Sequence, residues 1–305
     1  MVDITHKNST LRKAIAQAIV QVSLPETIQA IKNRTVPKGD VLECARVAGL
    51  FAAKRTADMI PDCHPLPVEF TSVSYEVGEM EVKILVEIHT IYKTGVEVEA
   101  MHAASVVALT MYDMLKPIDK GVMIEQIKLV EKKGGKSDLN KKPLGKDLKA
   151  KIVVCSDSIS AGKGEDKAGL AIQSKLEKHG ILGFDYVIIP DEFALIQKTA
   201  MEAVAEKFDL VIFTGGTGLS PRDVTPDALE GIIERRIPGI EEAIRNYGQQ
   251  RTPFAMLSRS IVGLIGETLI MGVPGSTKGA EESIDAVFPA VLHLFKVMEG
   301  ASFRH

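Results

Sequence analysis

The chain has 305 residues, a length that suits two domains of ordinary size better than one. Its hydrophobic fraction of 45% and charged fraction of 25% are typical of globular proteins, and its net charge of −3 argues against a nucleic-acid or membrane partner. The cysteines Cys44, Cys63 and Cys155 are scattered and no apolar run reaches about 18 residues, so we expect a reduced, cytoplasmic protein.

The first part of the chain mixes helical and strand-like patterns. In chain order the sequence predicts helices over 11–21 and 24–32, a helix that follows the N-cap Asp40, paired strands over 70–77 and 82–88, a helix over 96–115 and a strand over 122–131. Mixed helices and antiparallel strands predict an α+β domain.

The composition changes over residues 132–151, KKGGKSDLNKKPLGKDLKAK. This segment is rich in lysine and glycine, and its apolar residues follow neither a helical nor a strand-like spacing. We therefore predict a first domain over 1–138, a linker over 139–150 and a second domain over 151–305. In the second domain the apolar runs 152–155, 186–189, 210–213 and 269–273 alternate with helical stretches. This alternation predicts an α/β three-layer domain with a mostly parallel sheet.

In the first domain, Asp113 and Lys116 lie three residues apart on the predicted helix, and Glu99 lies nearly four turns earlier, so all three can point to one side. A lysine beside a carboxylate can transfer protons once burial or another cation lowers its pKa, but a solvated salt bridge is the simpler interpretation. Adjacent Cys63 and His64 do not have zinc-ligand spacing, and they are interpreted as ligand contacts or structural residues.

In the second domain, Thr214-Gly215-Gly216-Thr217-Gly218 directly follows an apolar strand, a position where backbone amides can surround an anion. Asp191 follows another strand, and Asp223 follows the glycine loop, so both carboxylates can hold one Mg²⁺ or can simply cap turns. Thr225 is a candidate helix cap before Pro226. The loop lacks the lysine of a P-loop, and Gly162-Lys163-Gly164 is a weak dinucleotide fingerprint.

Three long blocks occur in order in the first domain: KGDVLECARVAGLFAAKRTADMIPDCHPLP, KTGVEVEAMHAASVVALTMYDMLK and GGKS. They closely resemble cyclic pyranopterin monophosphate synthase, a family that converts a cyclised dihydro-GTP into cyclic pyranopterin monophosphate and pyrophosphate. The resemblance implies a ferredoxin-like fold and a hexamer. It implies catalytic roles for Lys38, Asp113 and Lys116, and substrate contacts for Asp62, Cys63, His64, Val98, Glu99 and Lys136.

The second domain contains VVCSDSISAG, IIPDE, VIFTGGTGLSPRDVTPDA and VPGSTKGAEES in order. These blocks resemble the molybdopterin adenylyltransferases of the MogA/MoaB group, typically trimers that transfer AMP from ATP to the phosphate of molybdopterin with Mg²⁺. The resemblance implies that Asp191 and Asp223 are catalytic and position the metal and the triphosphate. It implies ligand contacts for Asp157, Gly215, Gly216, Thr217, Gly218, Gly275 and Ser276.

Both resemblances lead to the biosynthesis of molybdenum cofactor, so the sequence predicts a bifunctional lyase and nucleotidyltransferase. The alternative is an active N-terminal lyase whose C-terminal half only binds molybdopterin. The expected partners are cyclised dihydro-GTP, molybdopterin and ATP, together with further copies of the chain in a trimer or hexamer.

Overall fold

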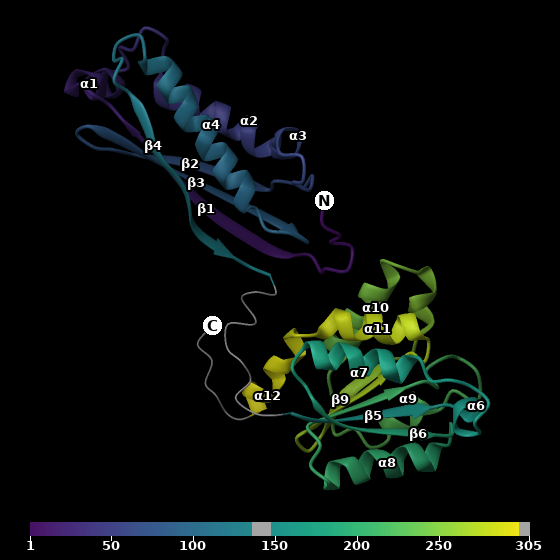
Figure 1. The fold of residues 1–305 in the computed structure, drawn as a ribbon. Coiled ribbons are helices and arrows are strands. Elements are labelled where there is room, and N and C mark those ends of the chain that lie inside the picture. The colour runs from purple at the N-terminus through teal and green to yellow at the C-terminus, as the bar shows by residue number, and fades with distance from the viewer. Residues whose placement is uncertain (136–147, 299–305) are drawn as a thin grey trace. The chain divides into compact units, whose positions relative to one another are not determined.

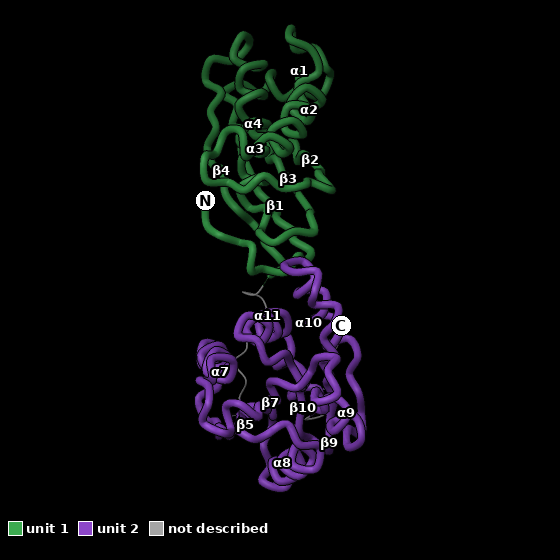
Figure 2. The backbone as a smooth tube through the Cα atoms, turned by 90° about the vertical axis from the view of Figure 1, so that its right-hand side faces the viewer, with its two compact units in different colours: residues 1–141 green, residues 142–305 purple. Residues whose placement is uncertain are grey.

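The computed structural model describes residues 1–135 and 148–298 (Figure 1). The chain divides into two compact units, Met1–Lys141 and Lys142–His305, each with its own sheet and apolar core (Figure 2). The predicted linker falls mostly outside the described residues, and its last residues, Lys149 and Ala150, lie in a strand of the second unit. No described helix has the length and apolar composition needed to cross a bilayer.

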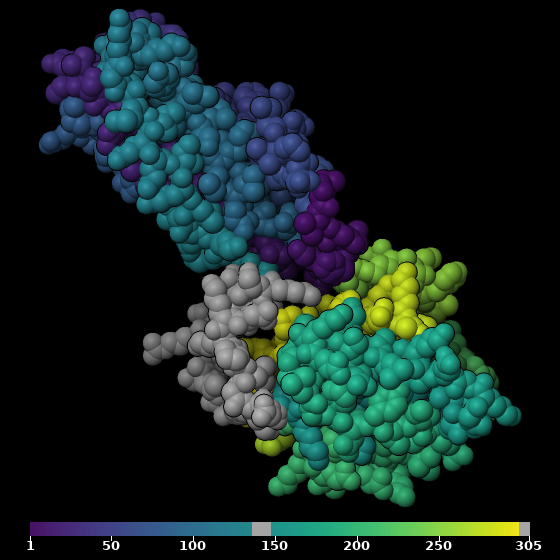
Figure 3. Space-filling model, in the orientation of Figure 1, coloured from purple at the N-terminus to yellow at the C-terminus, as the bar shows by residue number. Residues whose placement is uncertain are grey.

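The first unit contains a four-stranded antiparallel sheet in the order β2-β3-β1-β4. Helices α2 and α4 contact each other over one face of this sheet (Figure 1) and form an outer surface of the unit (Figure 3). In chain order the elements are β1 (Thr10–Gln21), α1 (Pro25–Asn33), α2 (Val41–Lys54), α3 (Thr56–Met59), β2 (Phe70–Val77), β3 (Glu81–Tyr92), α4 (Glu97–Leu115) and β4 (Met123–Lys133).

Several predicted boundaries in this unit are confirmed. The side chain of Asp40 accepts a hydrogen bond from the amide of Glu43 at 3.2 Å, which caps α2 as expected. Strands β2 and β3 pair with Val77 opposite Val82, and α4 ends at Leu115. The unit is therefore an α+β structure with its helices gathered on one face.

The prediction of a helix over residues 11–21 is wrong, because this segment forms strand β1. Its alanines favour a helix in isolation, but Ala14, Ala16, Ala18 and Val20 alternate with more exposed residues and are all buried beneath the helices. The strand pairs with β3 on one side and β4 on the other, so pairing and burial outweigh its local propensity. Its alanines face those of α4, which lets helix and sheet pack closely.

The second unit contains a six-stranded sheet in the order β6-β5-β7-β10-β9-β8. The four predicted apolar runs form β5, β6, β7 and β10, which run parallel, whereas β9 and β8 add an antiparallel edge. The strands are β5 (Lys149–Cys155), β6 (Gly183–Ile189), β7 (Leu210–Thr214), β8 (Arg235–Arg236), β9 (Ile261–Ile265) and β10 (Thr268–Val273).

Helices cover both faces of this sheet, which makes the unit a three-layer α/β structure. One apolar cluster joins the sheet to α7, α10 and α11, and another joins its opposite face to α8 and α9 (Figure 1). The helices are α6 (Asp157–Ser160), α7 (Ala168–Lys178), α8 (Phe193–Ala205), α9 (Thr225–Glu230), α10 (Pro238–Gln249), η1 (Pro253–Leu257), α11 (Thr277–Val287), η2 (Ala290–Leu292) and α12 (His293–Met298).

The strand order reverses at β5, because the chain passes from β5 to β6 on one side and then to β7 on the other. Ligands of open α/β sheets bind outside the carboxyl ends of strands at such a reversal. The residues that follow β5, β6, β7 and β10 therefore form the candidate site of this unit.

Candidate functional site

A cluster of two lysines and one aspartate lies at the C-terminal end of α4. Lys38 Nζ lies 2.7 Å from Asp113 Oδ2, and Lys116 Nζ lies 2.8 Å from Asp113 Oδ1. Lys38 Nζ also donates to the backbone carbonyl of Asp113 at 2.9 Å. The structure thus brings together the three residues for which the sequence predicts catalytic roles.

A lysine can abstract a proton only when its own pKa is lowered, and the charges in this cluster have the opposite effect. Hydrogen bonds from Lys116 and Lys38 lower the pKa of Asp113 to about 2. The Asp113 carboxylate in turn raises the pKa of Lys116 above its usual value. Lys116 is therefore a protonated ammonium at neutral pH, which can donate a proton or stabilise negative charge.

A second cluster lies at the N-terminal end of α4. The Cys63 thiol donates to Glu99 Oε1 at 3.1 Å, and burial together with this contact raises the pKa of Cys63 to about 12. Glu99 is only 2% exposed, and its Oε2 has no hydrogen-bond partner among the described residues. Burial raises the pKa of Glu99 above its ordinary value.

The neighbours of Cys63 and Glu99 are more exposed. His64 Nε2 lies 2.7 Å from the carbonyl oxygen of Val2, and Asp62 Oδ1 lies 2.8 Å from the amino group of Met1. Val98 precedes Glu99 and is 43% exposed. Among the described residues no group of three or more His, Cys, Asp or Glu side chains is arranged to hold a metal ion.

Glu99 does not join the cluster around Asp113 within one chain. The two residues are 14 positions apart on α4, which corresponds to about 21 Å along the helix axis. Glu99 is buried against Cys63, whereas the Asp113 side chain is 52% exposed. The predicted site residues of the first unit therefore form two separate groups at opposite ends of one helix.

Arg12 is a candidate that the sequence did not reveal, because its strand was interpreted as a helix. Its Nε donates to the carbonyl of Tyr92 at 3.2 Å. A Cβ atom on Gly135 would lie 1.9 Å from Arg12 Nη1, so the guanidinium lies directly against Gly135, in the loop that carries the GGKS block. Lys136, the lysine of this loop, lies outside the described residues.

In the second unit the glycines after β7 and β10 let three strand ends meet. Gly215 has φ +109°, and a Cβ atom there would lie 2.1 Å from the carbonyl oxygen of Cys155 at the end of β5. A Cβ atom on Gly275 would lie 2.8 Å from Gly215 Cα. Only glycine permits these approaches, so the ends of β5, β7 and β10 lie close together at one edge of the sheet, where the Gly215 amide donates to the carbonyl of Val273 at 3.2 Å.

Gly216 and Gly218 bring the glycine loop against the two predicted functional aspartates. A Cβ atom on Gly216, where φ is +61°, would lie 2.7 Å from Asp191 Oδ1, and one on Gly218 would lie 2.9 Å from Asp223 Oδ2. Thr217 lies between these glycines and is buried. The structure thus places the loop and both carboxylates at one edge of the sheet.

Asp191 is partly buried and lies close to two other carboxylates. Its Oδ1 is buried and has no hydrogen-bond partner among the described residues. Burial, followed by repulsion from Asp157 and Asp223, raises the pKa of Asp191. Its backbone amide donates to Asp157 Oδ1 at 3.2 Å. The described residues hold no group of three carboxylates arranged around a cation. The unpartnered Asp191 oxygen therefore fits a hard divalent cation that takes most of its ligands from substrate phosphates and water.

Arg259 fixes the loop that carries Asp223, a role that no local sequence pattern indicated. Its Nε donates to the carbonyl of Gly218 at 2.9 Å, and its Nη1 lies 2.9 Å from both carboxylate oxygens of Asp227. Its Nη2 also donates to the carbonyl of Asp223. One side chain thus joins two backbone carbonyls of the loop to Asp227 in the first turn of α9.

The prediction that Thr225 caps a helix is wrong. Thr225 is the first residue of α9 and Val224 occupies the N-cap position, without a side-chain capping bond. The Thr225 hydroxyl is instead buried beside Gly216, without a hydrogen-bond partner among the described residues. Ser276 does cap a helix, because its Oγ accepts from the amide of Gly279 at 3.2 Å at the start of α11.

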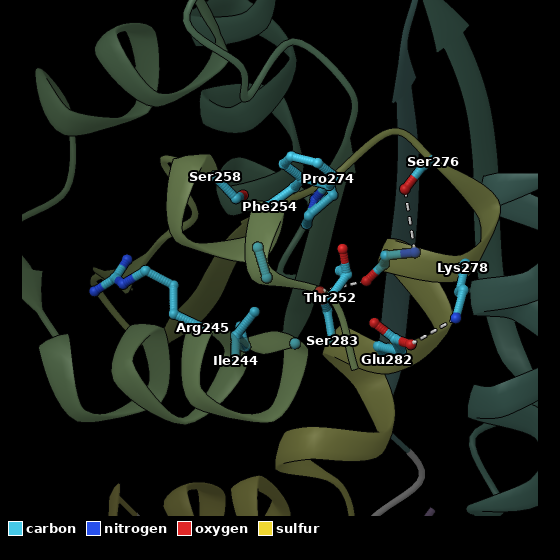
Figure 4. A pocket seen from close by; sticks show the side chains of 13 residues that line it. Ile244, Arg245, Thr252, Phe254, Ser258, Pro274, Ser276, Lys278, Glu282 and Ser283 are labelled. Carbon is cyan, nitrogen blue, oxygen red and sulfur yellow. Dashed lines mark hydrogen bonds and ion pairs between the residues drawn. The ribbon is translucent and has the colours of Figure 1, made fainter. Parts of the chain in front are cut away.

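A pocket of about 350 Å³ opens next to Ser276, between α10, η1 and α11 (Figure 4). Phe254 and Pro274 supply apolar surface, and Thr252 and Ser258 supply hydroxyl groups. Figure 4 shows Phe254, Pro274 and Ser258 close together on one side of the pocket. An apolar wall with a few polar groups is usual in sites that bind small molecules.

Comparison with known proteins assigns a family to each unit. Residues 1–135 match the MoaC family, and residues 151–293 match a probable molybdopterin binding domain. A molybdenum cofactor biosynthesis bifunctional protein of Chlorobaculum tepidum is 39% identical over 300 residues, which cover 98% of this chain and 95% of that protein. A cyclic pyranopterin monophosphate synthase of Nitratidesulfovibrio vulgaris is 48% identical over 139 residues, which cover 45% of this chain and 86% of that protein. The crystal structure of the molybdopterin biosynthesis enzyme MoaB of Thermus thermophilus is 38% identical, covers 52% of this chain and 99% of that one, and has a TM-score of 0.46.

Proposed function

Because the chain belongs to the family of bifunctional molybdenum cofactor biosynthesis proteins, we propose that each unit catalyses one reaction of that pathway. The first unit converts cyclised dihydro-GTP into cyclic pyranopterin monophosphate and pyrophosphate. The second unit transfers AMP from ATP to molybdopterin. The match over nearly the whole chain supports the pathway, and the geometry of each site supports the reaction.

The observation that carries the first activity is the arrangement of Lys38 and Lys116 around Asp113. Two ammonium groups against one carboxylate leave a positive charge for the phosphates of the substrate. Asp113 orients both lysines, and Lys116 holds a proton at Nζ that it donates to the reacting pterin precursor. The order of the elements and the strand order β2-β3-β1-β4 support a ferredoxin-like fold for this unit.

A homo-oligomer would explain why the predicted residues of this unit form two groups. Antiparallel packing of α4 from two copies would bring Glu99 of one copy near Asp113 of the other. Leu109, 58% exposed, and Phe51, 57% exposed, give the helical surface apolar side chains for such a contact. Light scattering on the full chain tests the trimer or hexamer, and a monomer would refute it.

The observation that carries the second activity is the unpartnered, buried oxygen of Asp191. Mg²⁺ is typically held by one or two carboxylates together with substrate phosphates and waters, and Asp191 and Asp223 meet this requirement. When bound, the cation would supply positive charge to the triphosphate of ATP. Because the Gly215 amide already donates to the carbonyl of Val273, the following amides of the loop, at residues 216–218, bind the phosphate of molybdopterin, and the pocket beside Ser276 holds the pterin ring.

The first activity is tested with enzymatically prepared cyclised dihydro-GTP. Wild-type protein should form cyclic pyranopterin monophosphate, and Lys116→Ala and Asp113→Asn should abolish it. A correctly assembled wild type that forms no product would rule out the lyase.

The second activity is tested by release of pyrophosphate from ATP in the presence of molybdopterin. Asp191→Asn and Asp223→Asn should stop this release without stopping the first reaction, because they lie in the other unit. Molybdopterin binding without pyrophosphate release by the wild type would support the alternative, a C-terminal half that only binds molybdopterin.

A further inference from the structure

Two arginines reach the loop after β7, and their surroundings differ sharply. Arg259 is 34% exposed and holds the carboxylate of Asp227 and two backbone carbonyls. Arg222 is 77% exposed, and the structure gives its guanidinium one side-chain partner among the described residues, Asp157. Arg259 is therefore committed to the loop, whereas most of the N–H donors of Arg222 face solvent.

Asp157 connects Arg222 to the segment that carries Asp191. One oxygen of Asp157 accepts from Arg222, and the other accepts from the amide of Asp191 at 3.2 Å. This carboxylate is also a source of the repulsion that raises the pKa of Asp191. Arg222 thus partly neutralises a cluster of three carboxylates, directly beside the position proposed for the metal and the triphosphate.

We propose that Arg222 is a nucleotide-binding residue, which Asp157 holds in place in the free protein and which transfers to the triphosphate of ATP when it binds. This inference rests on the adenylyl transfer proposed above. The planar guanidinium forms paired hydrogen bonds with phosphate oxygens, and a triphosphate offers it more negative charge than one carboxylate does. After the transfer, Asp157 keeps its hydrogen bond to the amide of Asp191.

A nucleotide is favoured over the phosphate of the pterin because of where Arg222 is anchored. Its partner Asp157 follows β5 and contacts the segment after β6, on the side of the carboxylates. The pocket proposed for the pterin lies instead beside Ser276, after β10. The triphosphate therefore meets Arg222 if it shares the metal with Asp191 and Asp223.

Calorimetric titration of the full chain with ATP, AMP and molybdopterin, each with Mg²⁺, tests this proposal. Arg222→Gln should weaken ATP binding at least tenfold and leave AMP binding unchanged, and Arg222→Lys should lose less. Asp157→Asn keeps an acceptor for the Asp191 amide and releases Arg222, so this variant should bind ATP at least as tightly as the wild type.

Arg235→Gln is the matched control, because Arg235 is an exposed arginine of the same unit that donates to the carbonyl of Gly266 at 2.8 Å. ATP affinity within twofold of wild type in Arg222→Gln would overturn the proposal, as would an equal loss in Arg235→Gln. A loss confined to molybdopterin would also overturn it and assign Arg222 to the pterin phosphate. Wild-type protein that binds no ATP would refute the adenylyl transfer itself, and with it this inference.

Discussion

Replacing Gly216 by alanine tests how closely the loop after β7 must approach Asp191. Gly216 has φ +61°, so alanine there costs about 1–2 kcal/mol from backbone strain alone. Its Cβ would also lie 2.5 Å from Thr225 Oγ1 and 2.7 Å from Asp191 Oδ1. Relieving these contacts adds about 1–3 kcal/mol, since the neighbouring side chains must move.

Gly266 provides the matched control for this substitution. Its φ of +56° is nearly the same, but no atom of the other described residues, its two chain neighbours aside, lies within 4 Å of the position of its Cβ. Gly266→Ala should therefore lose only the strain of about 1–2 kcal/mol. The difference between the two variants isolates the contacts with Thr225 and Asp191.

Urea unfolding followed by hydrogen exchange and mass spectrometry measures both variants. The chain contains no tryptophan, and peptides from β7 and β10 report the second unit separately from the first. Gly216→Ala should lower the free energy of unfolding of this unit by about 1–3 kcal/mol more than Gly266→Ala does. Equal losses in the two variants would refute the close approach.

Three further predictions concern the first unit and the pocket. In Lys116→Ala the pKa of Asp113 should rise from about 2 toward 3.8, as followed by carboxyl NMR. The lowered pKa contributes stability above pH 3.8 that is lost as the pH falls from 3.8 to about 2, so this contribution should be smaller in the variant; an unchanged pKa would contradict this ion pair. Asp40→Ala should lower the stability of the first unit by about 1 kcal/mol in urea unfolding, whereas Asp40→Asn should retain the cap; equal losses would argue against capping. Phe254→Ala should weaken binding of molybdopterin but not of ATP in equilibrium titrations. An unaltered affinity for molybdopterin would contradict the assignment of this pocket to the pterin ring.

The second unit could be predicted from the sequence because its signals are local. Parallel strands buried on both faces appear as continuous apolar runs, and the residues that follow them necessarily meet at one edge. Asp191, Asp223 and the glycine loop could therefore be placed together without knowledge of the contacts between them. The reversal of strand order at β5 then fixes which strand ends are adjacent.

Other features could not be predicted because they depend on tertiary contacts. The alanines of β1 favour a helix until the pairing with β3 and β4 is known. Arginine side chains are long, so nothing in the local sequence showed that Arg259 reaches two carbonyls of one loop or that Arg222 reaches Asp157. Helical spacing showed that Glu99 and Asp113 could share one side of a helix, but it could not show that Cys63 covers Glu99 while Asp113 stays exposed.

In the two reactions proposed above, both sites bind a phosphate-bearing substrate, but their charges are opposite. In the first unit Lys38 and Lys116 both pair with Asp113 and lower its pKa to about 2, so this cluster keeps a net positive charge. In the second unit burial and neighbouring carboxylates raise the pKa of Asp191, whose buried oxygen has no partner among the described residues. A polyanion approaching that edge is repelled until a cation binds there. Chelation of divalent ions should therefore stop the second reaction and spare the first, and equal inhibition of both would contradict this division.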